Sequence, residues 1–211
     1  MRSAMIFLRL FPIPMTNSVQ SLKFMISLLK KISVLAIAAF VAMAVSAQVK
    51  PGVETLRDGG FEQLKGKRVG LITNPSGVDN NLVSTIDILA NAPGVKLTAL
   101  YSPEHGVRGD IAAGEKVDTY TDSKTGVTVY SLYGKNKKPS AEMLKDVDVL
   151  VYDIQDNGCR SFTFISTMGL CMEACAENGK EFMVLDRPNP LSGLKVEGNL
   201  VEDGFYSLVS Q

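Results

Sequence analysis

Four polar, turn-rich segments hold the residue types that could carry out chemistry, and each follows an apolar run. They are Asn74–Gly77, Ser102–Gly109, Asp153–Arg160 and Asp186–Pro190. The second segment is the strongest candidate because it contains a glutamate beside the chain's single histidine, Glu104 and His105. A proline precedes this pair and two glycines follow it, a pattern typical of a shaped loop. This loop is therefore predicted to present a carboxyl group and an imidazole.

The absence of several common sequence motifs limits the kinds of reaction that the chain could catalyse. The sequence has no G-x-G-x-x-G, no G-x-x-x-x-G-K-[ST] and no G-x-S-x-G, so nucleotide-binding and serine-elbow signatures are absent. A single histidine also gives little support to a Cys/His zinc site, and we expect no cofactor. What remains is carboxylate chemistry. A glutamic acid can donate a proton, aspartates can stabilise positive charge at a sugar carbon, and arginines can grip an acidic group.

Several of these residues also have a purely structural interpretation. Asn74, next to a proline and a glycine, favours a simple turn when it is taken alone. Asp153 and Asp186 are compatible with caps of helices or turns. Arg160 and Arg187 are compatible with ion pairs to these aspartates. The sequence leaves these alternatives open.

The elements that position the segments alternate along the chain. Apolar runs predict strands at 68–73, 95–101, 126–132, 147–152 and 181–185, and helical spacing predicts helices at 82–90, 140–145 and 162–178. This alternation indicates an α/β fold with a mostly parallel sheet and helices on both faces. Ligands of such sheets bind beyond the carboxyl ends of the strands. We therefore expect the four polar segments to meet at one edge.

The charges are unevenly distributed. The 22 basic and 22 acidic residues cancel, but residues 1–47 hold five basic residues and no acidic one. The remainder is therefore mildly acidic, which argues against a nucleic-acid partner.

Of the cysteines, Cys171 and Cys175 lie four residues apart on one predicted helix, and we interpret them as small buried residues.

The basic start resembles an export signal. Lys30 and Lys31 precede a run of 14 uncharged residues, Ile32–Val45, and a small-residue cleavage site ends at Ala47. We predict an over-extended start at 1–24, a signal peptide at 25–47 and a mature chain from residue 48. The protein is then exported to the periplasm or the medium, without a stable membrane anchor. The alternative is an uncleaved anchor, although the run is shorter than the about 20 residues of a membrane span.

Five stretches of the sequence are similar to one known family. They cover 71–77, 100–109, 131–144, 151–164 and 184–193, and the longest motifs are SPEHG-x-RG and DIQD-x-G-x-R. The chain thereby resembles the exo-β-N-acetylmuramidases of the DUF1343, or NamZ-like, group. The resemblance implies a Rossmann-like catalytic domain, here residues 48–195, and a hydrolase that removes terminal N-acetylmuramic acid from non-reducing ends of peptidoglycan fragments.

The resemblance also implies roles for particular residues. Glu104 corresponds to the proposed general acid/base of the family, with His105 beside it. We take Glu104, His105 and Asp153 as catalytic candidates. The candidates for substrate binding are Asn74, Arg108, Gln155, Asp156, Arg160, Asp186, Arg187 and Asn189. Arg160 or Arg187 is expected to bind the lactyl carboxylate that distinguishes N-acetylmuramic acid from N-acetylglucosamine.

The sequence departs from the family in two respects. It ends soon after the stretch 196–205, so residues 196–211 are expected to begin a smaller C-terminal domain that is largely missing. Cys159 and Phe162 stand where the family pattern predicts a small residue and a tyrosine.

Two other functions stay open. One is an α/β domain that binds sugars or muropeptides without cleaving them, and the other is a hydrolase with Mg²⁺ held by Asp153, Asp156 and Asp186.

Overall fold

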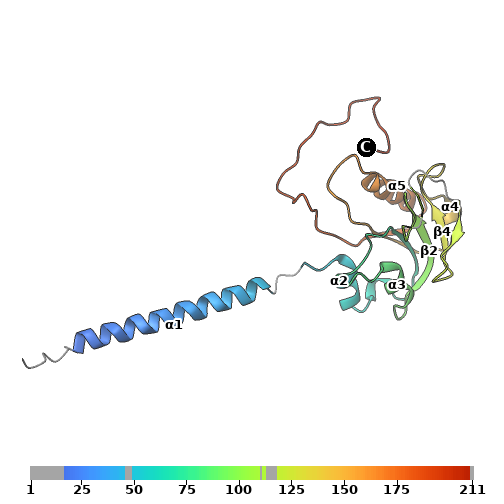
Figure 1. Ribbon diagram of the computed structural model, residues 1–211. Helices are drawn as coiled ribbons and strands as arrows, with labels where there is room; N and C mark the ends of the chain where they lie inside the picture. The colour runs from blue at the N-terminus through green and yellow to red at the C-terminus, as the bar shows by residue number, and fades with distance from the viewer. Residues whose placement is uncertain (1–16, 46–48, 110, 113–117, 210–211) are drawn as a thin grey trace, which may run out of the picture. The chain divides into compact units, whose positions relative to one another are not determined.

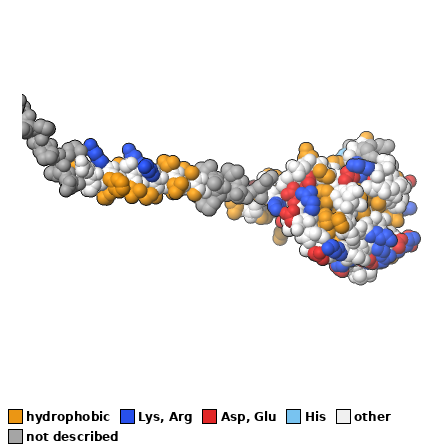
Figure 2. All heavy atoms as spheres, turned by 90° about the horizontal axis from the view of Figure 1, so that it is seen from below, with side chains coloured by type: hydrophobic (Ala, Val, Ile, Leu, Met, Phe, Trp, Pro, Cys, Tyr) orange, Lys and Arg blue, Asp and Glu red, His pale blue; other side chains and the backbone are white. Residues whose placement is uncertain are grey.

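The computed structural model describes residues 17–45, 49–109, 111–112 and 118–209. The chain forms two units, Met1–Gln48 and Val49–Gln211. The second unit contains the sheet and the polar segments (Figure 1). Acidic and basic side chains are interspersed over the face of this unit that Figure 2 shows.

One six-stranded sheet organises the second unit. Its strands are β1 (Arg68–Thr73), β2 (Lys96–Ser102), β3 (Tyr120–Thr121), β4 (Thr128–Ser131), β5 (Val149–Asp153) and β6 (Glu181–Val184). They lie in the order β3-β4-β2-β1-β5-β6, and every pairing except β3 with β4 is parallel. The mostly parallel sheet and its five principal strands are therefore confirmed. The two-residue antiparallel strand β3 was not predicted, because two residues carry no recognisable periodicity.

Helices cover both faces of this sheet. On one face, Val53 and Leu56 of α2 (Gly52–Asp58) pack with Ile86 and Leu89 of α3 (Thr85–Ala90) in a core that also holds Val69, Leu71 and Leu100. On the other face, Leu144 of α4 (Ala141–Leu144) packs with Cys171 and Cys175 of α5 (Phe164–Glu177), beside Ile72 and Tyr101. Alternate side chains of each strand enter opposite cores, as a sheet covered on both faces requires. The helix α2 and the short 3₁₀ helix Glu62–Leu64 were not predicted.

Local signals set the ends of two helices. Ser140 caps α4, its Oγ accepting a hydrogen bond from the Met143 amide at 3.3 Å. Asn178 follows the last residue of α5, and Gly179 has a left-handed backbone with φ 62°. The helices predicted at 140–145 and 162–178 are confirmed as α4 and α5. The two local signals fix where the chain turns back towards the sheet.

The carboxyl ends of β1 and β5 mark the switch point of the sheet. The chain leaves β1 to form β2 and β4 on one side, and later forms β5 and β6 on the other side. Thr73 and Asp153 are paired in register at this point. In open α/β sheets the crevice beyond such a point is the usual ligand site.

The N-terminal unit contains the helix α1 (Asn17–Val45), which includes the predicted apolar run 32–45. Figure 2 shows lysine side chains and exposed hydrophobic side chains along this helix. Among the residues that the structure describes, no helix combines the length and apolar character needed to cross a membrane. The predicted cleavage site, Ser46–Gln48, lies outside the described residues.

The last described stretch, residues 185–209, forms a long excursion without a helix or a multi-residue strand (Figure 1). It carries large apolar side chains that are almost fully exposed, among them Leu194 and Val196 at 96% each.

Candidate functional site

The four polar segments meet along the carboxyl edge of the sheet, as the parallel order predicts. The second segment touches the first at Gly109, where an added Cβ would lie 2.6 Å from Pro75 Cγ. The third segment joins the first and the fourth. The Gln155 amide donates to Ser76 Oγ at 2.9 Å, and Gln155 Nε2 donates to the Pro188 carbonyl at 2.9 Å. One continuous polar rim results.

The Glu104 loop has a strained backbone. Glu104 is half-buried and His105 is exposed. His105 has φ 74° and Gly106 has φ 81°, so two successive residues are left-handed. A non-glycine residue in this region costs about 1–3 kcal/mol and persists only where its surroundings hold it. Val107, which is 2% exposed and packs in the core, supplies part of that restraint.

Tyr133 lies next to Glu104 and was not among the predicted site residues. Interaction of its hydroxyl with the Glu104 carboxylate raises the pKa of Tyr133 above its usual range. Strand register explains why the two side chains approach each other. Ser102 pairs with Ser131, and Glu104 and Tyr133 each lie two residues after one of these serines. That equal offset from neighbouring strand ends is the signal that could have identified Tyr133.

Arg108 anchors the Glu104 loop. Its Nε donates to Asp122 Oδ1 at 2.6 Å, and its Nη2 donates to Asp122 Oδ2 at 3.0 Å and to Asp87 Oδ1 at 3.1 Å. The Asp122 side chain is only 3% exposed. Hydrogen bonding to Arg108 lowers the pKa of Asp122 to about 2. A guanidinium engaged in this way fits a positioning role better than the substrate contact expected from the sequence.

Asp153 and Arg187 form a buried ion pair at the switch point. Arg187 Nε and Nη2 donate to the two carboxylate oxygens at 2.6 and 3.0 Å, and the side chains are 7% and 0% exposed. Thr85 also donates to Asp153, and Arg187 reaches the Val78 carbonyl at 2.8 Å. This geometry favours the structural alternative for both residues. Their predicted direct roles at the substrate stay predictions.

Asn74 shapes the turn after β1. Its Oδ1 accepts hydrogen bonds from the amide and the hydroxyl of Ser76 at 2.9 and 2.5 Å. Gly77 completes the turn, because a Cβ there would lie 2.1 Å from Thr73 Oγ1. The turn interpretation of Asn74 therefore has direct geometric support.

The segment after β5 is folded on itself. Asp156 Oδ1 accepts from the Gly158 amide at 2.6 Å, whereas its buried Oδ2 has no hydrogen-bond partner among the described residues. Gly158 is packed so closely against Asn189 that a Cβ would lie 2.5 Å from its Oδ1. Arg160 is exposed, and its Nη2 donates to the Asn199 carbonyl at 2.5 Å.

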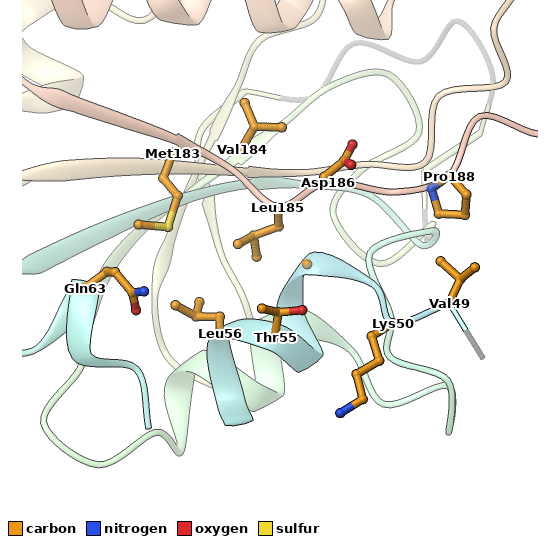
Figure 3. Close-up of a pocket in the computed structure, with 11 residues that line it drawn as sticks. Val49, Lys50, Thr55, Leu56, Gln63, Met183, Val184, Leu185, Asp186 and Pro188 are labelled. Carbon is orange, nitrogen blue, oxygen red and sulfur yellow. The ribbon is translucent and has the colours of Figure 1, made fainter. Parts of the chain in front are cut away.

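One cavity at the rim is lined by Arg160 together with residues 199–202 and 205. Two other cavities concern the remaining segments. The larger, about 490 Å³, lies between α2 and β6 and is lined by Thr55, Leu56, Met183, Leu185 and Asp186 among others. In Figure 3 the Asp186 carboxylate points away from Leu56 and Thr55. The smaller, about 350 Å³, is lined by Tyr133, the residue that interacts with Glu104, but not by Glu104 itself. The larger cavity is lined by one predicted site residue, Asp186, and the smaller cavity by none. We place the chemistry near the smaller one because Tyr133, which lines it, interacts with Glu104.

No group of three or more His, Cys, Asp or Glu side chains is arranged to hold a metal ion within the described part of the chain. Asp153, one of the candidate Mg²⁺ ligands, is already paired with Arg187. The cysteines are free, and Cys171 and Cys175 are buried, as predicted. Burial raises the pKa of Cys175 to about 11.

Taken together, the rim offers one carboxyl group positioned for proton transfer. Glu104 lies in a strained loop and interacts with Tyr133, which lines a cavity. A carboxylic acid so placed can protonate a leaving oxygen. Among the aspartates nearby, Asp122 and Asp153 are held in ion pairs with Arg108 and Arg187.

Comparison with known proteins gives consistent results. The family model "Exo-beta-N-acetylmuramidase NamZ, N-terminal" matches residues 69–211. The peptidoglycan beta-N-acetylmuramidase NamZ of Bacillus subtilis (strain 168) is 58% identical over 162 residues, which are 77% of this chain and 39% of that protein.

Two solved structures of DUF1343 family proteins from Bacteroides fragilis NCTC 9343 are also similar. One is 68% identical with a TM-score of 0.72, and the alignment covers 77% of this chain and 40% of that one. The other is 36% identical with a TM-score of 0.65, and the alignment covers 78% and 41%. The chain thus spans about 40% of the length of these relatives.

Proposed function

The chain belongs to the NamZ family, also called DUF1343, and from this membership we propose that it provides the catalytic edge of an exo-β-N-acetylmuramidase. Its substrates are peptidoglycan fragments, and the reaction releases N-acetylmuramic acid from their non-reducing ends. The observation that carries the proposal is Glu104, held in a left-handed loop and in contact with Tyr133, which lines a cavity.

In this proposal Glu104 is the general acid/base. As an acid, it donates a proton to the glycosidic oxygen while the bond to the sugar carbon breaks. Tyr133 orients the carboxyl group through its hydroxyl. Arg108 fixes the loop to Asp122 and Asp87. The Asp153–Arg187 pair holds the ends of β5 and β6 in register behind the site.

We also propose that the protein is exported. The basic residues Lys30 and Lys31 and the apolar run 32–45 support this proposal. A peptidoglycan substrate lies outside the cytoplasmic membrane, so export and the proposed reaction agree with each other.

Hydrolysis of a chromogenic β-N-acetylmuraminide tests the function, with the corresponding β-N-acetylglucosaminide for comparison. Because the relatives are longer, the assay uses the full 211-residue chain and a chimera. In the chimera, the 162 aligned residues replace their counterparts in the B. subtilis relative. We expect the chimera to cleave only the muraminide, and Glu104→Gln to lower its rate by about 10²- to 10⁴-fold.

Glu142→Gln is the matched control. Glu142 is an exposed glutamate of α4 whose partner is Lys145, so its removal should leave the rate unchanged. Near-normal turnover in a folded Glu104→Gln chimera would exclude Glu104 as the acid. Saccharide binding without any product from the folded chimera would instead favour a binding domain.

A further inference from the structure

The cavity that Tyr133 lines contains a lysine without an ion-pair partner among the described residues. It is lined by Tyr133, Lys135 and Asn136 from the loop after β4, and by Ser131, Asp118 and Thr119. Lys135 is exposed and forms no ion pair with any residue in the described part of the chain. Its neighbour Lys138, by contrast, is paired with Glu173 and Glu177.

The arginines of the rim are engaged elsewhere. Arg187 is bound to both oxygens of Asp153 and is 7% exposed. Arg108 is bound to Asp122 and Asp87. Arg160 donates to the Asn199 carbonyl and lines a separate cavity with residues 199–202 and 205. None of the three lines the cavity beside Tyr133, whereas Lys135 does.

We propose that Lys135 is a specificity-determining residue that binds the lactyl carboxylate of the terminal N-acetylmuramic acid in this cavity. The inference rests on the proposed function and names the group that separates the two amino sugars. N-acetylglucosamine lacks the lactyl group and gains nothing from an ammonium at this position. Thr119, Asn136 and Asp118 offer polar groups to the sugar hydroxyls, and the Asp118 carboxylate disfavours an anion on its own side of the cavity.

A binding measurement on the full 211-residue chain tests the inference without requiring turnover. Calorimetry is run with N-acetylmuramic acid and with N-acetylglucosamine on wild type and Lys135→Gln. We expect Lys135→Gln to weaken binding of N-acetylmuramic acid by about tenfold, the size of one charge-assisted hydrogen bond. Binding of N-acetylglucosamine should not change, and Lys135→Arg should preserve the preference.

Lys137→Gln is the control. It also removes one lysine charge, two residues along the chain from Lys135, but Lys137 does not line this cavity. Muramyl dipeptide identifies the carboxylate, since its lactyl group is an amide and its one free carboxylate belongs to the peptide. We expect its binding to be insensitive to Lys135→Gln. A tenfold loss with the dipeptide, an equal loss with Lys137→Gln, or a wild-type chain without preference for N-acetylmuramic acid would overturn the inference.

The two proposals can fail separately. If the chimera cleaves the muraminide but Lys135→Gln leaves saccharide preference intact, the function stands and Lys135 is not the determinant. If Lys135 controls binding while the chimera does not turn over, the subsite stands and the glycosidase does not.

Discussion

Single residues at the rim act mainly by holding other residues in place, and Asp122 is the clearest case. It is nearly buried, accepts two hydrogen bonds from Arg108 and is also bound by Thr125. The carboxylate form is therefore stabilised in the folded protein, and its pKa falls to about 2. Stability from this group is fully present above the unfolded pKa of about 3.9 and is lost as pH falls towards 2.

We predict that Asp122→Asn lowers the free energy of unfolding at pH 7 and that the deficit shrinks by roughly 2 kcal/mol between pH 5 and pH 2. Urea denaturation of the wild type and the variant across this range measures it. Asp146→Asn, which removes an exposed partner of Arg68, should change stability by at most about 0.5 kcal/mol. A deficit for Asp122→Asn that stays constant with pH would contradict the assignment.

At the scale of elements, the Asp153–Arg187 pair joins β5 to the segment after β6 and to the turn after β1. We predict that Arg187→Met destabilises the protein by about 3–5 kcal/mol, because it leaves a buried carboxylate unpaired. The double variant with Asp153→Asn should regain part of this loss, since a neutral amide is less costly to bury. Lys67→Met, which breaks the surface pair with Glu181, should cost at most about 1 kcal/mol.

Thermal and chemical unfolding of the four proteins measure these differences. If Arg187→Met unfolds like Lys67→Met, the pair contributes little to the fold. Arg187 would then be available for the substrate role expected from the sequence.

The sequence predicts the strands and helices better than it predicts the roles of individual residues on them. Near-continuous apolar runs such as 68–73 and 147–152 identify parallel strands by themselves, because burial on both faces leaves a local pattern. An ion pair between residues that are distant in the sequence leaves no such local pattern. Asp153 and Arg187 lie 34 residues apart, and only the sheet order shows that they neutralise each other. The role of Tyr133 likewise depends on the register of β2 and β4.

At the scale of the whole molecule, the chain consists of two units, and the proposed export separates them at residue 47. A signal peptidase needs a small residue directly before the cleaved bond, whereas the preceding position is permissive. We predict that the exported protein begins at Gln48, that Ala47→Phe blocks processing, and that Ser46→Phe does not. Intact mass and N-terminal sequencing of the exported fraction measure the outcome. Equal processing of both variants, or an exported protein that retains residues before 48, would contradict the proposed signal peptide.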